Sequence, residues 1–193
     1  MLVKPVESVI WDFNGTLLDD LDLVVRTVNG QLEKRGLPPL TAEGYRDVFG
    51  FPVEDYYRRI GLDFETESMA DLAADFFADY EPQLRNCELH EGAFGRARSS
   101  LSVRRQAVCP LGDGGGDAQQ HARDSGNPKR FVAAYGLAHQ EGDSKVSRGG
   151  DLLAYFGIGR ATALLVGDTD HDAEVASALG VPVALVEIGR AHV

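Results

Sequence analysis

Acidic residues follow two strand-like segments that lie far apart in the chain. An apolar run over residues 6–11 predicts a buried strand that ends at Asp12, with Gly15 close behind it. A second run, over residues 162–166, ends in Gly167-Asp168-Thr169-Asp170-His171-Asp172. Open α/β sheets bind ligands beyond the carboxyl ends of their strands, and carboxylates are preferred ligands of hard divalent cations. The two acidic strand ends therefore predict two halves of one cation site.

Two motifs at these strand ends resemble those of a known family. Residues 12–17, Asp-Phe-Asn-Gly-Thr-Leu, resemble the first motif of the haloacid dehalogenase-like hydrolase superfamily. Residues 167–173, Gly-Asp-Thr-Asp-His-Asp-Ala, resemble its fourth motif as it occurs in the phosphoglycolate phosphatase-like branch. Lys145 stands where the lysine of the third motif would fall. The resemblance covers most of the chain and is weak between about Ala93 and Arg130.

The resemblance implies an α/β fold with a Rossmann-like three-layer core, a mainly parallel sheet and an inserted α-helical cap. Four amphipathic segments follow one another in residues 18–86 without a strand among them. Ordinary crossovers between parallel strands are shorter than this, so we assign residues 18–86 to the cap. Residues 1–17 and 87–193 then form the hydrolase core.

Hydrophobic spacing and capping residues place the individual elements. In the cap, helices are predicted over residues 21–32, 42–49, 54–60 and 68–84. In the core, we expect strands over residues 106–109, 131–136 and 182–188, and helices after Lys145 and over residues 173–179.

The resemblance gives the acidic residues specific roles. Asp12 is the candidate nucleophile, since a carboxylate that attacks phosphorus forms an aspartyl-phosphate and splits a difficult hydrolysis into two steps. Mg²⁺ is the implied cofactor, held by Asp12, a main-chain carbonyl at Asn14, and Asp168. Asp172 would hold a metal-bound water or orient Lys145.

The same resemblance places the substrate phosphate between Lys145 and the first-motif turn. Lys145 would balance the carboxylates and contact the transferred group. Exposed amides at Gly15 and the hydroxyl of Thr16 are candidate phosphate donors. The preferred function is Mg²⁺-dependent hydrolysis of a small phosphomonoester, with Asp12, Asn14 and Lys145 as the catalytic set.

Asn14 departs from the family pattern, because the phosphatases carry an aspartate there that protonates the leaving oxygen and later activates water. An amide does not titrate near neutrality, and general acid–base help is typically worth about 10²–10⁴ in rate. Three interpretations stay open. The chain is a weak phosphatase suited to good leaving groups, it uses another acid such as Asp19, Asp20 or a cap residue, or it binds phosphate compounds without turning them over.

The second motif of the family, a Ser or Thr at a strand end, is not visible next to Cys109. The Gly-rich and polar residues around positions 110–130 could not bury a helical face. Two interpretations remain for residues 93–129: a loop that replaces a helix, or a segment that is out of frame with an ancestral gene.

Composition limits the partners. The net charge of −11 opposes a large phosphate-backbone footprint, so nucleic acid is not expected. No apolar run approaches the roughly 20 residues that span a bilayer, and no signal-peptide layout is visible at the N-terminus. We therefore expect a cytoplasmic protein, either a monomer or a homodimer. The resemblance, rather than the composition, implies that its partner is a small phosphorylated metabolite.

Overall fold

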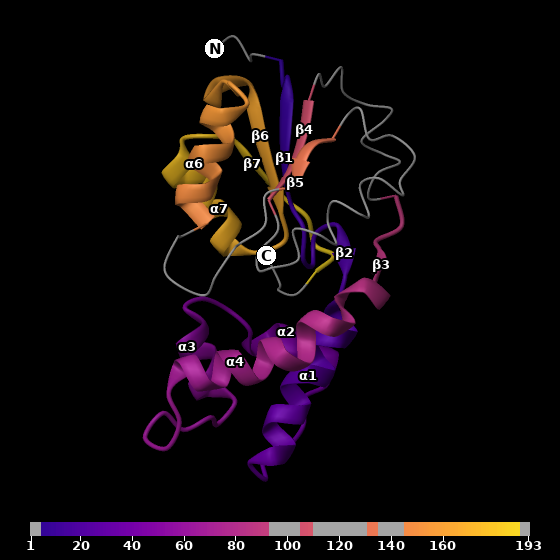
Figure 1. Ribbon diagram of the computed structural model, residues 1–193, viewed down its shortest axis with the longest axis vertical. Coiled ribbons are helices and arrows are strands. Elements are labelled where there is room, and N and C mark those ends of the chain that lie inside the picture. Colours follow the sequence, from indigo (N-terminus) through magenta and orange to yellow (C-terminus); the bar gives the residue numbers. More distant parts are fainter. Residues whose placement is uncertain (1–4, 93–104, 110–130, 135–144, 190–193) are drawn as a thin grey trace.

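A computed structural model describes residues 5–92, 105–109, 131–134 and 145–189 (Figure 1). Its centre is a sheet with the strand order β5-β4-β1-β6-β7. All neighbouring strands in this sheet pair in parallel, which confirms the predicted α/β core. The strands are β1 (Ser8–Asp12), β4 (Arg105–Cys109), β5 (Phe131–Ala134), β6 (Ala163–Gly167) and β7 (Val183–Leu185).

Two helices, α6 (Lys145–Tyr155) and α7 (Asp170–Leu179), cover one face of this sheet (Figure 1). A short 3-10 helix, η3 (Arg160–Thr162), leads from α6 into β6. Apolar side chains of the sheet and both helices form one buried cluster that includes Ile10, Leu152, Leu165, Val175 and Leu179. The third layer that the resemblance implies is not tested by the described residues, and residues 110–130 lie outside them.

The other helices gather at one end of the sheet (Figure 1). They are α1 (Leu21–Lys34), α2 (Ala42–Val48), α3 (Val53–Arg59), α4 (Met69–Tyr80) and the 3-10 helix η1 (Glu81–Asn86). We call α1–α4 and η1 the helical lobe. Its buried core is continuous with apolar residues of the first motif, because Phe13 and Leu17 pack in the same cluster as Leu32 and Leu72.

Local sequence explains where these helices begin and end. The Thr41 side chain accepts a hydrogen bond from the Gly44 amide and caps α2. Ser68 and Asp71 form the predicted capping box of α4. The predicted helix over residues 68–84 is too long, since α4 ends at Tyr80 and Pro82 lies in the first turn of η1. Proline lacks the amide hydrogen that an α-helix needs and clashes with the preceding turn.

Two short strands join the helical lobe to the sheet. β2 (Leu18–Asp19) and β3 (Glu88–Leu89) pair antiparallel, and the His90 amide donates to the Leu17 carbonyl beside them. The sequence did not reveal this pair, because two-residue strands carry no periodic pattern. The predicted division at residues 18 and 86 falls near it, and the division into domains stays a prediction. Within the described residues, no helix is both long and apolar enough to cross a membrane.

Candidate active site

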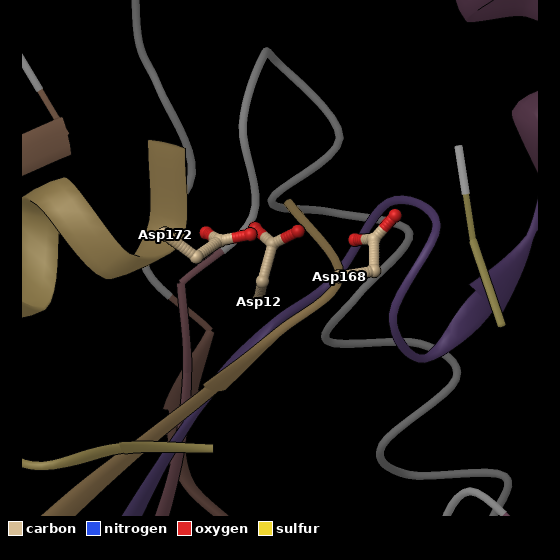
Figure 2. A group of neighbouring side chains, drawn as sticks. All are labelled: Asp12, Asp168 and Asp172. Atoms are coloured by element: carbon tan, nitrogen blue, oxygen red, sulfur yellow. The ribbon is translucent and has the colours of Figure 1, made fainter. Parts of the chain in front are cut away.

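Three buried carboxylates meet at the carboxyl edge of the sheet (Figure 2). Asp12 is the last residue of β1, Asp168 directly follows β6, and Asp172 lies in the first turn of α7. One oxygen of each lies within 4.8 Å of the others. β1 and β6 are neighbours in the sheet, so parallel pairing brings the two acidic strand ends together as the sequence predicts.

Lys145, the first residue of α6, joins this group from the other side. Its Nζ lies 3.0 Å from Asp12 Oδ1 and forms a second ion pair with Asp172, and all three side chains are buried. Burial alone would lower the pKa of Lys145, but the negative charges of Asp12 and Asp172 outweigh it and raise that pKa. For Asp172, burial favours the neutral acid, but the charge of Lys145 and the hydrogen bonds from Lys145 and Thr169 together hold the pKa of the carboxyl below its ordinary value. This contact is compatible with the orienting role of Asp172, and both roles named for Asp172 stay predictions.

The negative charge of Asp12 is less well compensated than that of Asp172. Burial raises its pKa to about 7, Lys145 opposes this, and the charges of Asp172 and Asp168 add to it. Three carboxylates face a single lysine here, which leaves an excess of negative charge in a desolvated place. A divalent cation bound to the carboxylates would remove that excess, so the donor set fits Mg²⁺.

Two threonines hold the acidic side chains in place. The Thr16 hydroxyl donates to Asp168 Oδ1 over 2.7 Å and lies 3.4 Å from Asp12 Oδ2. Asp172 Oδ2 accepts from the amide and the hydroxyl of Thr169, which makes Asp172 part of a capping box. This box starts α7 at Asp170, three residues before the predicted start. The role of Thr16 as a phosphate donor stays a prediction.

Asn14 is buried and is held by the helical lobe. Its Nδ2 donates to the hydroxyl of Tyr80 over 3.0 Å, and that hydroxyl donates to the buried Asp20 carboxylate. Asp20 is one of the alternative acids that the sequence suggested. Tyr80 was missed, because its only sequence signal is a place in the apolar stripe of α4 and it lies 66 residues from Asn14. The second-motif position falls beyond Cys109, outside the described residues.

Two glycines leave room for the carboxylates. A Cβ added to Gly167 would lie 2.3 Å from the Asp172 carboxyl carbon, and one added to Gly189 would lie 1.9 Å from Asp168 Oδ2 and 2.5 Å from the Gly15 carbonyl oxygen. Neither distance is compatible with a side chain at these positions. The backbone after β7 therefore packs directly on the acidic cluster.

Gly189→Ala is expected to displace Asp168 and to lower the free energy of unfolding by about 1–3 kcal/mol, the usual range for overpacking. Urea denaturation with and without Mg²⁺ would measure this loss. The matched control is Gly150→Ala in α6, where no atom lies within 4 Å of an added Cβ. Alanine there should stabilise the helix by about 0.5–1 kcal/mol. Equal stability of the two variants would contradict the close packing of Gly189 on Asp168.

The helical lobe contacts the core at two further points beside the site. The Phe51 ring stacks on His171, with ring centroids 4.3 Å apart. Arg46 of α2 donates to the Gly189 carbonyl over 3.1 Å. Since His171 lies in the first turn of α7 and Gly189 packs on Asp168, both contacts place the lobe over the carboxylate cluster.

The comparisons with known proteins agree with this geometry. Residues 9–94 match the family model described as haloacid dehalogenase-like hydrolase. No curated protein matches the sequence. A solved haloacid dehalogenase-like family hydrolase from Streptococcus pneumoniae is 17% identical, with a TM-score of 0.76 over 97% of this chain and 87% of the other.

Two further solved structures have the same fold. A predicted phosphoglycolate phosphatase from Haemophilus somnus is 18% identical, with a TM-score of 0.71 over 98% of this chain and 89% of the other. Protein tyrosine kinase A from Mycobacterium tuberculosis is 25% identical, with a TM-score of 0.72 over 98% of this chain and 87% of the other.

The matched segment and the fold point to the same superfamily. Residues 9–94 carry the family signature of haloacid dehalogenase-like hydrolases, and the described chain has the fold of that superfamily. The resemblance seen in the sequence is thereby confirmed.

Proposed function

We propose that this chain is a Mg²⁺-dependent phosphatase that hydrolyses small phosphomonoesters through an aspartyl-phosphate on Asp12. The observation that carries the proposal is the buried group of Asp12, Asp168 and Asp172 around Lys145. Burial of three carboxyl groups against one lysine is unfavourable unless a cation also binds there, and a bound cation would in turn attract an anionic substrate.

Each side chain of the site has its own role in the proposed reaction. Asp12 Oδ attacks phosphorus while the ester P–O bond breaks, and the departing alkoxide takes its proton from water because Asn14 cannot supply one. A water molecule then attacks the phosphorus of the aspartyl-phosphate, which breaks the bond to Asp12, restores its carboxylate and releases phosphate. Lys145 keeps Asp12 in place and offsets charge on the transferred group. Asp168, fixed by Thr16, would hold the metal together with Asp12 and the Asn14 carbonyl, and Asp172, fixed by Thr169, would hold a metal-bound water or orient Lys145. When bound, Mg²⁺ supplies positive charge where the phosphate oxygens lie.

A second candidate function is phosphate-ligand binding with weak or no turnover. The specific observation is Asn14, whose amide is hydrogen-bonded to Tyr80 and cannot transfer a proton. Proteins described as a tyrosine kinase and as a phosphoglycolate phosphatase share this fold, so the fold alone does not distinguish the two candidates. The expected substrate class, a small phosphorylated metabolite, and the cytoplasmic location remain proposals from the sequence.

A panel of small phosphomonoesters, assayed with Mg²⁺ and with EDTA, distinguishes the two candidates. Phosphate release should require the metal and should be fastest for good leaving groups, because Asn14 cannot protonate the leaving oxygen. Asp12→Asn serves as the control and should show no release. No release from any substrate, while Mg²⁺ still raises the melting temperature, would favour the binding protein.

A further inference from the structure

A buried chain of hydrogen bonds runs from the first motif into the helical lobe. Asn14 lies in the turn after β1, Tyr80 is the last residue of α4, and Asp20 is the N-cap of α1. Asn14 is 6% exposed, Tyr80 2% and Asp20 0%. A buried polar atom without a hydrogen-bond partner destabilises the fold, so each donor in this row of three side chains must face an acceptor.

The direction of these hydrogen bonds follows from Asp20. A carboxylate only accepts, so the single hydrogen of the Tyr80 hydroxyl is directed at Asp20. The Tyr80 oxygen then accepts, and its partner must be a donor. The amino group of Asn14 is that donor, at 3.0 Å. The carboxylate at position 20 therefore requires a hydrogen-bond donor at position 14, and the amide of Asn14 supplies it.

A carboxylate at position 14 would not fit this chain. It has no hydrogen to donate, and the Tyr80 hydroxyl cannot donate one hydrogen to two carboxylates at once. One of the two carboxylates would then lose its hydrogen bond to the phenol, and a buried acceptor that loses its partner destabilises the fold. The presence of Asp20 thus makes the aspartate of the family pattern a poor fit at position 14.

We propose that Tyr80 and Asp20 are positioning residues matched to Asn14, so that the identity of residue 14 is set by the carboxylate at position 20. If position 14 becomes aspartate and position 20 becomes asparagine, the direction of both hydrogen bonds reverses. An amide at position 20 donates to the Tyr80 oxygen, and the Tyr80 hydroxyl donates to a carboxylate at position 14. This inference rests on the proposed phosphatase function for its consequence in turnover, and on geometry alone for its consequence in stability.

The stability test uses Asn14→Asp with and without Asp20→Asn. The single variant should lower the melting temperature by about 5 °C, and the added Asp20→Asn should recover most of that loss. Asp19→Asn is the matched control, because Asp19 is the neighbouring residue and its side chain is 58% exposed. In a Tyr80→Phe background the recovery should disappear, since no hydroxyl remains to connect the two positions.

The turnover test uses the same variants with the best substrate of the panel. Asn14→Asp alone should raise kcat by no more than about 10-fold, because its carboxylate is poorly oriented. The Asn14→Asp/Asp20→Asn variant should raise kcat by about 10²–10⁴-fold with little change in KM, as expected for restored general acid–base help. A purely structural role for Tyr80 and Asp20 would not produce this separation of kcat from KM.

The stability and turnover results each support or overturn the proposed match between residues 14 and 20. If Asp20→Asn brings no recovery to Asn14→Asp, or Asp19→Asn recovers as much, the matched pair is overturned. The same holds if Asn14→Asp alone is as stable as the wild type and fully active. Recovery of the melting temperature without turnover in any variant would support the pair and overturn the proposed phosphatase function.

Discussion

Asp12→Asn is expected to abolish phosphomonoester hydrolysis, with a loss of about 10⁴-fold or more, as for other enzymes that lose their nucleophile. The same change should stabilise the metal-free protein above neutral pH. Burial raises the pKa of Asp12 to about 7, whereas its value in an unfolded chain is near 3.8. The folded state therefore binds this proton more tightly, and the stability that it contributes is present below about pH 4 and lost as the pH rises to about 7.

The measurement is the melting temperature of both proteins in EDTA, from pH 4 to pH 8. Wild type should lose stability across this window, and Asp12→Asn should lose less, so the two curves should diverge toward pH 8. Addition of Mg²⁺ at pH 8 should stabilise wild type more than the variant, because the variant lacks one of the carboxylates. Parallel curves would contradict the raised pKa of Asp12.

Lys145→Met is expected to lower the free energy of unfolding by about 3–5 kcal/mol, because it leaves buried carboxylates without their cation. Lys145 is 7% exposed and pairs with both Asp12 and Asp172. Hydrolysis should be lost as well, since the lysine positions the nucleophile. Mg²⁺ should recover more stability in this variant than in wild type, because the metal supplies positive charge to the same carboxylates.

Lys34→Met is the matched control. The Lys34 side chain is 51% exposed and lies 2.8 Å from Asp75, so its loss should cost less than about 1 kcal/mol and leave turnover unchanged. Urea denaturation of both variants, with Mg²⁺ and with EDTA, gives the comparison. Similar losses in the two variants would show that Lys145 does not balance buried charge.

Local patterns predicted most of the fold and the carboxylates of the site. The apolar run that ends at Asp12 and the one that ends before Asp168 each have a strand's length and a polar stop. Parallel pairing of these two strands is enough to bring the carboxylates together. The caps at Thr41 and Ser68 are also local, since each side chain bonds an amide three residues away.

Contacts between distant elements were not predictable from the sequence. Tyr80 lies in an apolar stripe, and nothing in α4 indicates that its hydroxyl reaches the first motif. The packing of Gly189 on Asp168 depends on how the chain turns after β7, which no spacing encodes. α4 ends early because of Pro82, a residue whose effect on a helix could have been read from the sequence.

The order of strands in the sheet has a consequence for how the chain acquires its native state. β1 leaves the ribosome well before its two neighbours in the sheet, because β4 and β6 begin only at Arg105 and Ala163. Contacts over such separations close large loops and form slowly, whereas the helices between Leu21 and Tyr80 contact one another over short stretches. We therefore expect the helices of the lobe to pack first and the pairing that brings Asp12 to Asp168 to form later. Mutual repulsion of the carboxylates thus arises only when nearly all other contacts exist to oppose it.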